Sequence, residues 1–143
     1  MSGKTIWDPL RRKDVPLTPE ERVRQWFIGV MHSDMHVPMH MMMSEVGFKF
    51  GDGPVQKDFR ADIVVYDRKP APAMIVECKR PDVELDGQVM EQALRYNAVL
   101  NVRHIAVTNG LKTFFVTKGE DGVFRAADKI PDYEEIISQE TRK

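Results

Sequence analysis

The alternation of apolar and polar residues predicts helices and strands in a mixed order along the chain. The first helix is predicted over residues 19–32, because Thr18 can act as its N-cap, a proline follows, and Glu21 closes a capping box. Apolar side chains then recur at helical spacing and form one stripe, made of Val23, Trp26, Phe27, Val30 and Met31. Pro38 interrupts any continuation of this helix, and a second short helix is expected from Pro38 to Glu45.

Shorter apolar runs bounded by turn residues predict strands. They cover residues 46–50, 62–66, 74–79, 104–108 and 112–117. Apolar spacing predicts a helix over residues 86–100, and a short helix with a frayed end is expected after Pro131. The run at 74–79 is apolar on both faces in its first half, which indicates a central, covered strand. The order of elements predicts an α/β fold in which a mixed sheet is flanked by helices.

The chain is expected to form one domain with two short extensions. Its 143 residues are too few for two ordinary domains. Residues 1–17 are interpreted as an N-terminal arm without a core of its own, residues 18–130 as the domain, and residues 131–143 as a C-terminal tail. In the arm, the basic run Arg11-Arg12-Lys13 is expected to be solvated, with contact to a phosphate as the alternative.

Charge and composition narrow the classes of partner. The 21 basic and 22 acidic residues give a net charge of −1, which excludes a strongly basic coat but leaves room for a local basic groove. There is no apolar run of about 18 residues, and the N-terminal residues, which lack an apolar stretch, are not expected to act as a secretory signal. The single cysteine, Cys78, excludes an internal disulfide and suits a reducing compartment. We therefore expect a soluble cytoplasmic domain that does not bind membranes.

Ionisable residues interrupt the apolar middle of the chain. Glu77 and Lys79 are two residues apart, so on a strand their side chains share a face. Asp62 opens the preceding predicted strand, and it would lie beside Glu77 if the two strands are neighbours. Two close carboxylates repel each other, and a divalent cation with a preference for oxygen ligands, Mg²⁺ or Mn²⁺, would resolve that repulsion. The alternative is a structural ion pair between Glu77 and Lys79.

Such a site predicts a hydrolytic role for the residues around it. A metal lowers the pKa of a bound water and stabilises charge on a phosphodiester. Lys79 can orient the attacking water or neutralise developing charge. Gln92 and Tyr96 are four residues apart on the next predicted helix, from which they can hydrogen-bond to the site or touch a phosphate.

A Met-His pair recurs three times in the segment 31–43, at residues 31–32, 35–36 and 39–40. Thioether and imidazole ligands suit copper, so the segment raises the alternative of a metal-binding protein. The repeat drifts around a helix and Pro38 breaks it. Core packing by the methionines with histidines at the surface is therefore the expected interpretation.

The candidate site resembles a known nuclease family. Asp62 followed by Glu77-Cys78-Lys79 resembles the PD-(D/E)xK nuclease core, and Gln92 with Tyr96 matches the Q-x-x-x-Y element of its RecB-like branch. Together with further segments, these residues resemble the amino-terminal nuclease domain of type I restriction enzyme R subunits over roughly residues 18–117. The further segments are Thr18-Pro19-Glu20-Glu21-x-Val23-Arg24, Arg60-x-Asp62-Ile63-Val64-Val65-Tyr66-Asp67, Val76 and Pro81 around the Glu-x-Lys element, Ala93 and Asn97 around Gln92 and Tyr96, and Thr108-Asn109-Gly110.

This resemblance implies a restriction-endonuclease-like fold and Mg²⁺-dependent hydrolysis of DNA, with Mn²⁺ as a substitute. It implies that Asp62 and Glu77 bind the metal and that the backbone carbonyl of Cys78 assists. It implies a catalytic role for Lys79. Gln92 and Tyr96 would support the site or contact DNA. A glutamate from the preceding helix often joins such sites, and Glu45 is expected in that place, with a solvated helix-end carboxylate as the alternative.

The motor of type I enzymes has no counterpart in this sequence. It contains no GxxxxGK[ST] phosphate loop, so no nucleotide is expected to bind. We expect either a free-standing domain or one that binds a motor or specificity chain as a partner subunit. Such a partner, or self-association, would strengthen the binding of DNA. The rival interpretation is a catalytically silent module of the same fold that binds DNA or docks subunits.

Overall fold

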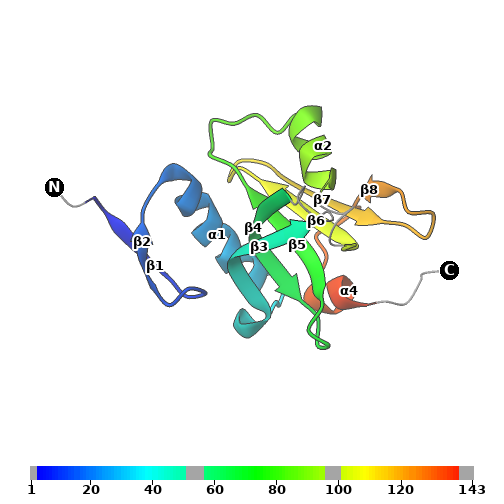
Figure 1. The fold of residues 1–143 in the computed structure, drawn as a ribbon, viewed down its shortest axis with the longest axis horizontal. Coiled ribbons are helices and arrows are strands. Elements are labelled where there is room, and N and C mark those ends of the chain that lie inside the picture. Colours follow the sequence, from blue (N-terminus) through cyan, green and yellow to red (C-terminus); the bar gives the residue numbers. More distant parts are fainter. Residues whose placement is uncertain (1–2, 51–56, 96–100, 139–143) are drawn as a thin grey trace.

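The computed structural model describes residues 3–50, 57–95 and 101–138 (Figure 1). A small N-terminal hairpin precedes a six-stranded sheet with helices on both of its faces. The elements in chain order are β1 (Thr5–Asp8), β2 (Lys13–Pro16), α1 (Pro19–Ser33), a single 3₁₀ turn (Met39–Met41), β3 (Met42–Phe50), β4 (Lys57–Tyr66), β5 (Pro72–Cys78), α2 (Gly87–Arg95), β6 (His104–Thr108), β7 (Thr113–Lys118), β8 (Phe124–Ala126) and α4 (Tyr133–Ile137).

The sheet is mixed, as the sequence predicts. Its strands lie in the order β3-β4-β5-β6-β7-β8, and neighbours are antiparallel except for β5 and β6, which are parallel. The parallel pair requires a crossover connection, and α2 lies in it. β5 and β6 are therefore the central strands, and nearly all of their residues are buried. The prediction of a central covered strand at 74–79 is confirmed.

Two apolar clusters fill the two faces of the sheet. On one face α1 and α4 pack against alternate residues of the central strands, such as Met74 and Val76. On the other face α2 packs against the intervening residue Ile75 and against Ile105. The chain thus has one layer of helix on each side of the sheet, which is the flanked α/β arrangement expected from the order of elements.

Helix α1 begins where the sequence predicts but presents a different face to the sheet. Thr18 caps it, since its hydroxyl oxygen accepts a hydrogen bond from the Glu21 backbone N–H at 3.0 Å. The predicted stripe included Trp26, which is 47% exposed. The buried face includes Arg24 and Ile28 instead. The apolar pattern alone could not reveal this rotation, because Arg24 is buried through ion pairs with other parts of the chain.

The predicted second helix over residues 38–45 is wrong. Only Met39–Met41 form a 3₁₀ turn, and the chain is extended from Met42 onward. β3 pairs with β4 from Met42 opposite Val65, so sheet pairing overrides the local helical preference of this segment. Glu45 consequently lies on a strand and not at the end of a helix.

The methionines of the Met-His repeat behave as the core-packing interpretation predicts. Met31 and Met35 are fully buried in the cluster beneath α1. His36 and His40 are exposed. The repeat therefore places its sulfur atoms and its outward imidazoles on different sides of the chain.

The N-terminal segment is more structured than an arm. Strands β1 and β2 form an antiparallel hairpin in which Asp8 and Val15 are buried. Arg11 forms ion pairs with Asp8 and, at 2.8 Å, with Glu21 of α1. The expectation that the basic run is solvated is thus wrong for Arg11, which fastens the hairpin to the first turn of α1.

The C-terminal segment closes the α1 face of the sheet. The predicted short helix is present as α4, and the preceding strand β8 was not predicted. Tyr133 is buried, and its hydroxyl donates a hydrogen bond to the Tyr66 carbonyl oxygen at 2.8 Å. Within residues 3–50, 57–95 and 101–138, no helix is both long and apolar enough to cross a bilayer.

Candidate functional site

Asp62 and Glu77 lie on the neighbouring strands β4 and β5, as the predicted shared site would require. β4 and β5 are antiparallel, with Ile63 opposite Val76, so the next step of the register sets Asp62 opposite Glu77. The Asp62 carboxylate accepts a hydrogen bond from the Cys78 backbone N–H at 2.6 Å. The strand register and this hydrogen bond fix the Asp62 side chain at the end of β5, beside the start of the Glu77-Cys78-Lys79 segment.

Glu77 is a buried carboxyl group with an unsatisfied oxygen. Its residue is 7% exposed, and its Oε1 has no hydrogen-bond partner among the described residues. Burial raises the pKa of Glu77 to about 8, and the nearby Asp62 adds to this effect, while the positive charge of Lys79 opposes it. A buried carboxyl oxygen without a partner costs free energy in the folded state, so this position favours a proton or a cation.

Asp62 shares that electrostatic strain. Burial raises the pKa of Asp62 to about 6, although the hydrogen bond from Cys78 and the charge of Arg24 act in the opposite direction. Glu20, in the first turn of α1, raises the pKa of both Asp62 and Glu77 through its negative charge. Three carboxylates from α1, β4 and β5 therefore contribute negative potential to one place.

Arg24 is the main counter-charge that sequence reasoning did not assign to the site. Its guanidinium lies 2.7 Å from Glu45 Oε1, 3.6 Å from Asp62 Oδ1 and 3.7 Å from Glu21 Oε2. Its Nη1 also donates a hydrogen bond to the Ser44 hydroxyl at 3.2 Å. The only signal in the sequence is an arginine three residues after Glu21 on the helical face that carries Val23 and Phe27. From the sequence alone, an arginine at this position would be predicted to be exposed, because its ion-pair partners Glu45 and Asp62 are far away along the chain.

Glu45 is placed against arginines and on a strained piece of backbone. Its φ is +57°, in the left-handed region that residues other than glycine rarely adopt. Its Oε2 lies 3.3 Å from Arg60 Nη1, while Oε1 accepts from Arg24. Burial would raise its pKa, but the hydrogen bond and charge of Arg24 and the contact with Arg60 hold the pKa of Glu45 below its usual value. In this arrangement the carboxylate is an acceptor for two guanidinium groups.

Lys79 and Gln92 lie together with Glu77 at a small recess between the sheet and α2. The recess is lined by Glu77, Lys79, Val89, Gln92 and Ala93. Lys79 follows the last residue of β5, and its backbone N–H donates to the Thr108 carbonyl oxygen at 2.8 Å. This bond holds the Lys79 backbone against the last residue of β6, at the end of the two central strands. Tyr96, the remaining predicted site residue, lies outside the described residues.

Cys78 contributes its backbone and not its thiol to this region. Its side chain is buried in the cluster beneath α1, and burial raises the pKa of the thiol well above its usual value. The backbone N–H already binds Asp62. Its carbonyl oxygen is the group that the resemblance predicts as a metal ligand.

Comparison with known proteins identifies the family of this chain. Residues 19–131 match the sequence model of the family described as type I restriction enzyme R protein N terminus (HSDR_N). The chain belongs to this family. The search of curated proteins gives no match.

A solved structure shares the fold of this R-protein N-terminal domain. It is a fragment assigned to an HsdR subunit of a type I restriction enzyme from Vibrio vulnificus YJ016, with 20% sequence identity and a TM-score of 0.63. The match covers 84% of the present chain and 24% of the other, so this chain spans about a quarter of that structure's length. This likeness shows that the present chain and that fragment share a fold.

The oxygen donors of this domain fit a hard divalent cation, although they do not form a complete cage. Among the described residues, no group of three His, Cys, Asp or Glu side chains is gathered closely enough to hold a metal ion. Asp62 and the unsatisfied Oε1 of Glu77 are nevertheless oxygen donors in a buried, negatively charged place. Mg²⁺ commonly takes one or two carboxylates and keeps several waters, so a two-carboxylate set suits it.

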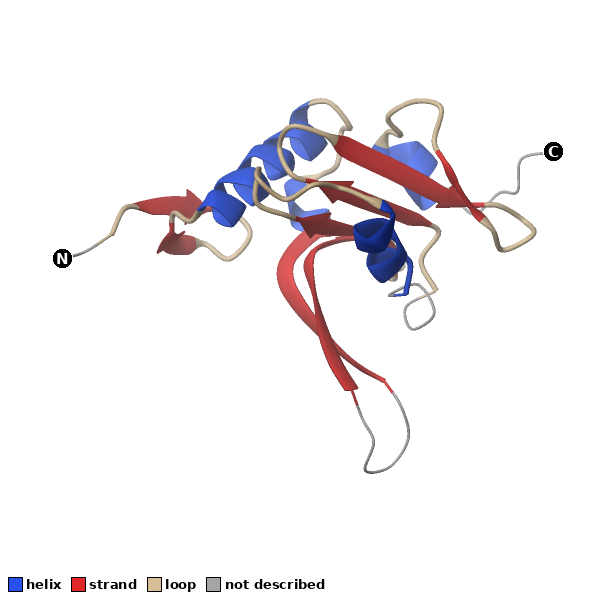
Figure 2. Cartoon of the chain, turned by 90° about the horizontal axis from the view of Figure 1, so that it is seen from above, coloured by secondary structure: helices blue, strands red, loops and turns tan. Residues whose placement is uncertain are grey.

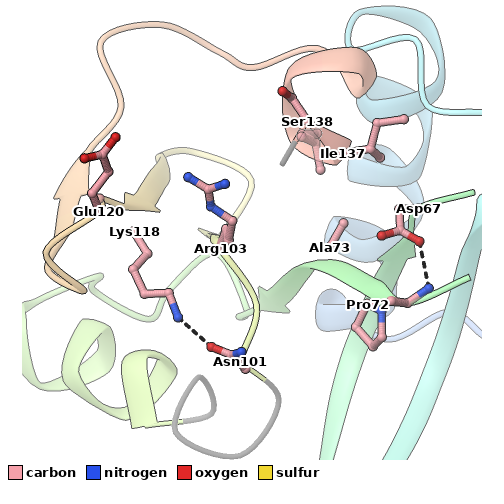
Figure 3. Close-up of a pocket in the computed structure, with 12 residues that line it drawn as sticks. Asp67, Pro72, Ala73, Asn101, Arg103, Lys118, Glu120, Ile137 and Ser138 are labelled. Atoms are coloured by element: carbon pink, nitrogen blue, oxygen red, sulfur yellow. Dashed lines mark hydrogen bonds between the residues drawn. The ribbon is translucent and has the colours of Figure 1, made fainter. Parts of the chain in front are cut away.

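A further depression of the domain lies at the opposite end of the central strands. Figure 3 shows it between the start of β5, the end of β7 and α4, with Arg103 and Lys118 on one side and Ile137 on the other. The Lys118 ammonium donates to the Asn101 side-chain oxygen at 2.7 Å. None of its lining residues belongs to the predicted site, which lies about 20 Å away along β5 at the usual rise per residue.

Proposed function

We propose that this R-protein N-terminal domain hydrolyses DNA phosphodiester bonds in a divalent-metal-dependent reaction of the PD-(D/E)xK type. The observation that carries the proposal is the buried Glu77, whose Oε1 has no hydrogen-bond partner in the described part of the chain and which lies across the strand register from Asp62. A structural ion pair would leave neither a missing partner nor a second carboxylate at this position. A cation-binding site accounts for both.

The carboxylates would hold Mg²⁺ or Mn²⁺ between them. Glu77 would supply its unsatisfied Oε1, Asp62 the oxygen that faces away from the Cys78 N–H, and Cys78 its backbone carbonyl. The bound cation would supply Lewis-acid stabilisation of the phosphodiester and lower the pKa of a water. Asp62 would have to exchange its 3.6 Å contact with Arg24 for the cation.

Lys79 and Gln92 would act on the water and the phosphate. The Lys79 ammonium acts electrostatically on Glu77 and lies at the same recess, where a compact cation can orient the attacking water or offset charge in the transition state. Gln92 reaches the recess from α2 and can donate its amide to a phosphate oxygen. Tyr96 stays a predicted member of the site.

A plasmid-nicking assay with purified protein tests the proposal. Supercoiled plasmid should be nicked in Mg²⁺ or Mn²⁺ and remain intact in EDTA. Glu77→Ala and Lys79→Ala should each lower the rate at least 100-fold, whereas the exposed controls Glu84→Ala and Lys69→Ala should keep it. Equal rates for the site variants and their controls would refute the assignment.

A catalytically silent module is the second candidate, and the Arg24 cluster favours it. The guanidinium contacts Asp62 and Glu45 and so neutralises carboxylates that a metal site would use. In that case the wild type would bind DNA without nicking it, and Mn²⁺ would not bind at Asp62 and Glu77. Isothermal titration with Mn²⁺ separates the two candidates before any substrate is added.

The partners proposed for the domain follow from its family. The matching solved structure is described as part of a subunit of a type I restriction enzyme, and the present chain covers only about a quarter of it. We propose that a motor or specificity chain, or a second copy of this chain, contributes part of the binding affinity for DNA. The net charge of −1 supports this, since it gives weak general attraction to phosphates.

A further inference from the structure

We propose that the outer part of the β3–β4 hairpin binds the backbone of duplex DNA beside the candidate site. This part, here called the β-arm, comprises residues 46–50 and 57–61. The inference deepens the proposed function, because it names the element that would hold the substrate and the form of that substrate. Its test measures binding without cleavage, so that either idea can fail alone.

The β-arm projects from the body of the domain as a two-stranded ribbon (Figure 2). Pairing between β4 and β5 begins at Ile63, whereas β3 and β4 remain paired outward from Val46 opposite Ala61. Within the described residues, the outer half of β4 thus pairs with β3 alone. An isolated two-stranded ribbon is marginally stable in water. The base of this one packs on the body of the domain through Val46, Phe48 and Ala61, and the polar face of its outer part is exposed.

A cross-strand aromatic pair stiffens the β-arm. Phe48 and Phe59 face each other across the register, and their rings are stacked with centroids 5.3 Å apart. Phe48 also packs against the apolar cluster beneath α2. The pair lies on one face of the ribbon, since opposed residues share a face and neighbours alternate. The β-arm is therefore a braced projection with its other face available for contacts.

That other face is polar and leads back to the candidate site. It carries Gly47, Lys49 and Arg60, together with Asp58, and all four are exposed. Arg60 links the ribbon to the site, because its Nη1 lies 3.3 Å from Glu45 Oε2. Lys49 is farther out along the same face. Lys49 and Arg60 thus place two basic side chains on the face that leads toward Asp62, with Asp58 opposite Lys49 in the strand register.

The dimensions of the β-arm suit double-stranded DNA. A two-stranded ribbon fits the major groove, which is about 12 Å wide. The five residues from Val46 to Phe50 extend about 17 Å, or about five base pairs at 3.4 Å per pair. A lysine on an edge strand also discourages pairing with another sheet, so a second copy of this chain is a poorer occupant than DNA.

Fluorescence anisotropy with a labelled 30-base-pair duplex in EDTA tests this inference. Lys49→Glu should weaken binding about tenfold or more at 100 mM salt, and Lys49→Ala should lower the slope of log K against log salt by about 0.9. The matched control is Lys69→Glu, an equal charge change at an exposed lysine of the β4–β5 turn. A shortened ribbon, with residues 48–59 replaced by Asn-Gly, should lose as much affinity as Lys49→Glu or more.

Three outcomes would overturn the assignment. These are no measurable binding of duplex by the wild type at 50 mM salt, equal affinities for Lys49→Glu and Lys69→Glu, or a wild-type dimer in light scattering that the shortened ribbon converts to a monomer. Circular dichroism and thermal melting confirm that each variant is folded. Failure of plasmid nicking would leave the binding result intact, and nicking without dependence on Lys49 would leave the nuclease proposal intact.

Discussion

At the scale of single residues, the site is a balance between buried carboxylates and one buried arginine. Arg24 is among the least exposed charged residues described, with a side chain 5% exposed, and its contacts reach Glu21, Glu45 and Asp62. Its Nε nonetheless has no hydrogen-bond partner within the described residues. Removing one member of a buried ion cluster leaves the charges of the others uncompensated. We therefore expect the loss of Arg24 to lower the stability of the fold strongly.

The first prediction concerns this arginine. Arg24→Gln should lower the free energy of unfolding by about 3–5 kcal/mol, because it removes the buried guanidinium that contacts Asp62 and Glu45, although Glu45 keeps its contact with Arg60. Urea unfolding followed by circular dichroism measures the change. The control is Arg22→Gln, at an exposed position two residues earlier on α1, which should change stability by less than about 0.5 kcal/mol. Equal losses in the two variants would show that Arg24 is not a structural counter-ion.

How far the sequence predicts this site depends on the range of each interaction. The proximity of Asp62, Glu77 and Lys79 could be predicted from the sequence, because it requires only the alternation of side chains along a strand and the adjacency of two strands. The roles of Arg24 and Glu45 could not, since both depend on contacts across more than fifteen residues and, for Glu45, on an unusual backbone angle. Local pattern carries no information about either.

At the scale of elements, prediction succeeded where a segment has one strong local preference. The run 104–108 is predicted as a strand and forms β6 with the same limits, since every residue in it is buried. Residues 38–45 have only a weak helical preference, and pairing with β4 decides their conformation from Met42 onward. The hairpin of residues 5–16 was missed because its stability depends on Arg11 and its contact with α1.

The turn between β6 and β7 shows how an element places the site. Gly110 has φ +87°, and its backbone N–H donates to the Thr108 hydroxyl at 3.2 Å. A Cβ added there would lie 3.3 Å from a methyl group of Val23, which precedes Arg24 on α1. The turn therefore touches α1 directly and fixes the helix relative to the end of β5, where Lys79 binds Thr108.

The second prediction tests this contact by comparing two glycines. Gly110→Ala should destabilise the domain by about 1 kcal/mol more than Gly122→Ala. Both positions have positive φ, so both variants incur the left-handed strain, but Gly122 has open space where a Cβ would lie. Thermal and urea unfolding measure the difference. Equal losses of stability in the two variants would mean that Val23 can move aside without a loss of free energy. The turn would then not fix the position of α1.

At the scale of the whole molecule, cation binding, protonation and folding are linked. The pKa of Glu77 is about 8 in the folded domain, above its ordinary value of 4.5, and that of Asp62 is about 6 against 3.8. The unfolded chain therefore releases these protons at lower pH than the folded one. The stability that the two groups contribute is fully present below pH 4 and is lost progressively as the pH rises toward 8.

A divalent cation should reverse this trend, which gives the third prediction. Because the cation binds ionised carboxylates, its affinity should rise between pH 6 and pH 8.5. A concentration of Mn²⁺ ten times its dissociation constant adds about 1.4 kcal/mol to the free energy of unfolding. The rise in melting temperature caused by a fixed Mn²⁺ concentration should consequently be larger at pH 8.5 than at pH 6.

Glu77→Gln separates this linkage from general ionic effects. The variant keeps the shape of the side chain but cannot ionise, so it should lose both the decline of stability toward pH 8 and the stabilisation by Mn²⁺. Glu84→Gln, at an exposed position before α2, should retain both. A Mn²⁺ effect of equal size in the two variants would place the cation elsewhere, and the shared oxygen site of Asp62 and Glu77 would then be refuted without reference to any cleavage assay.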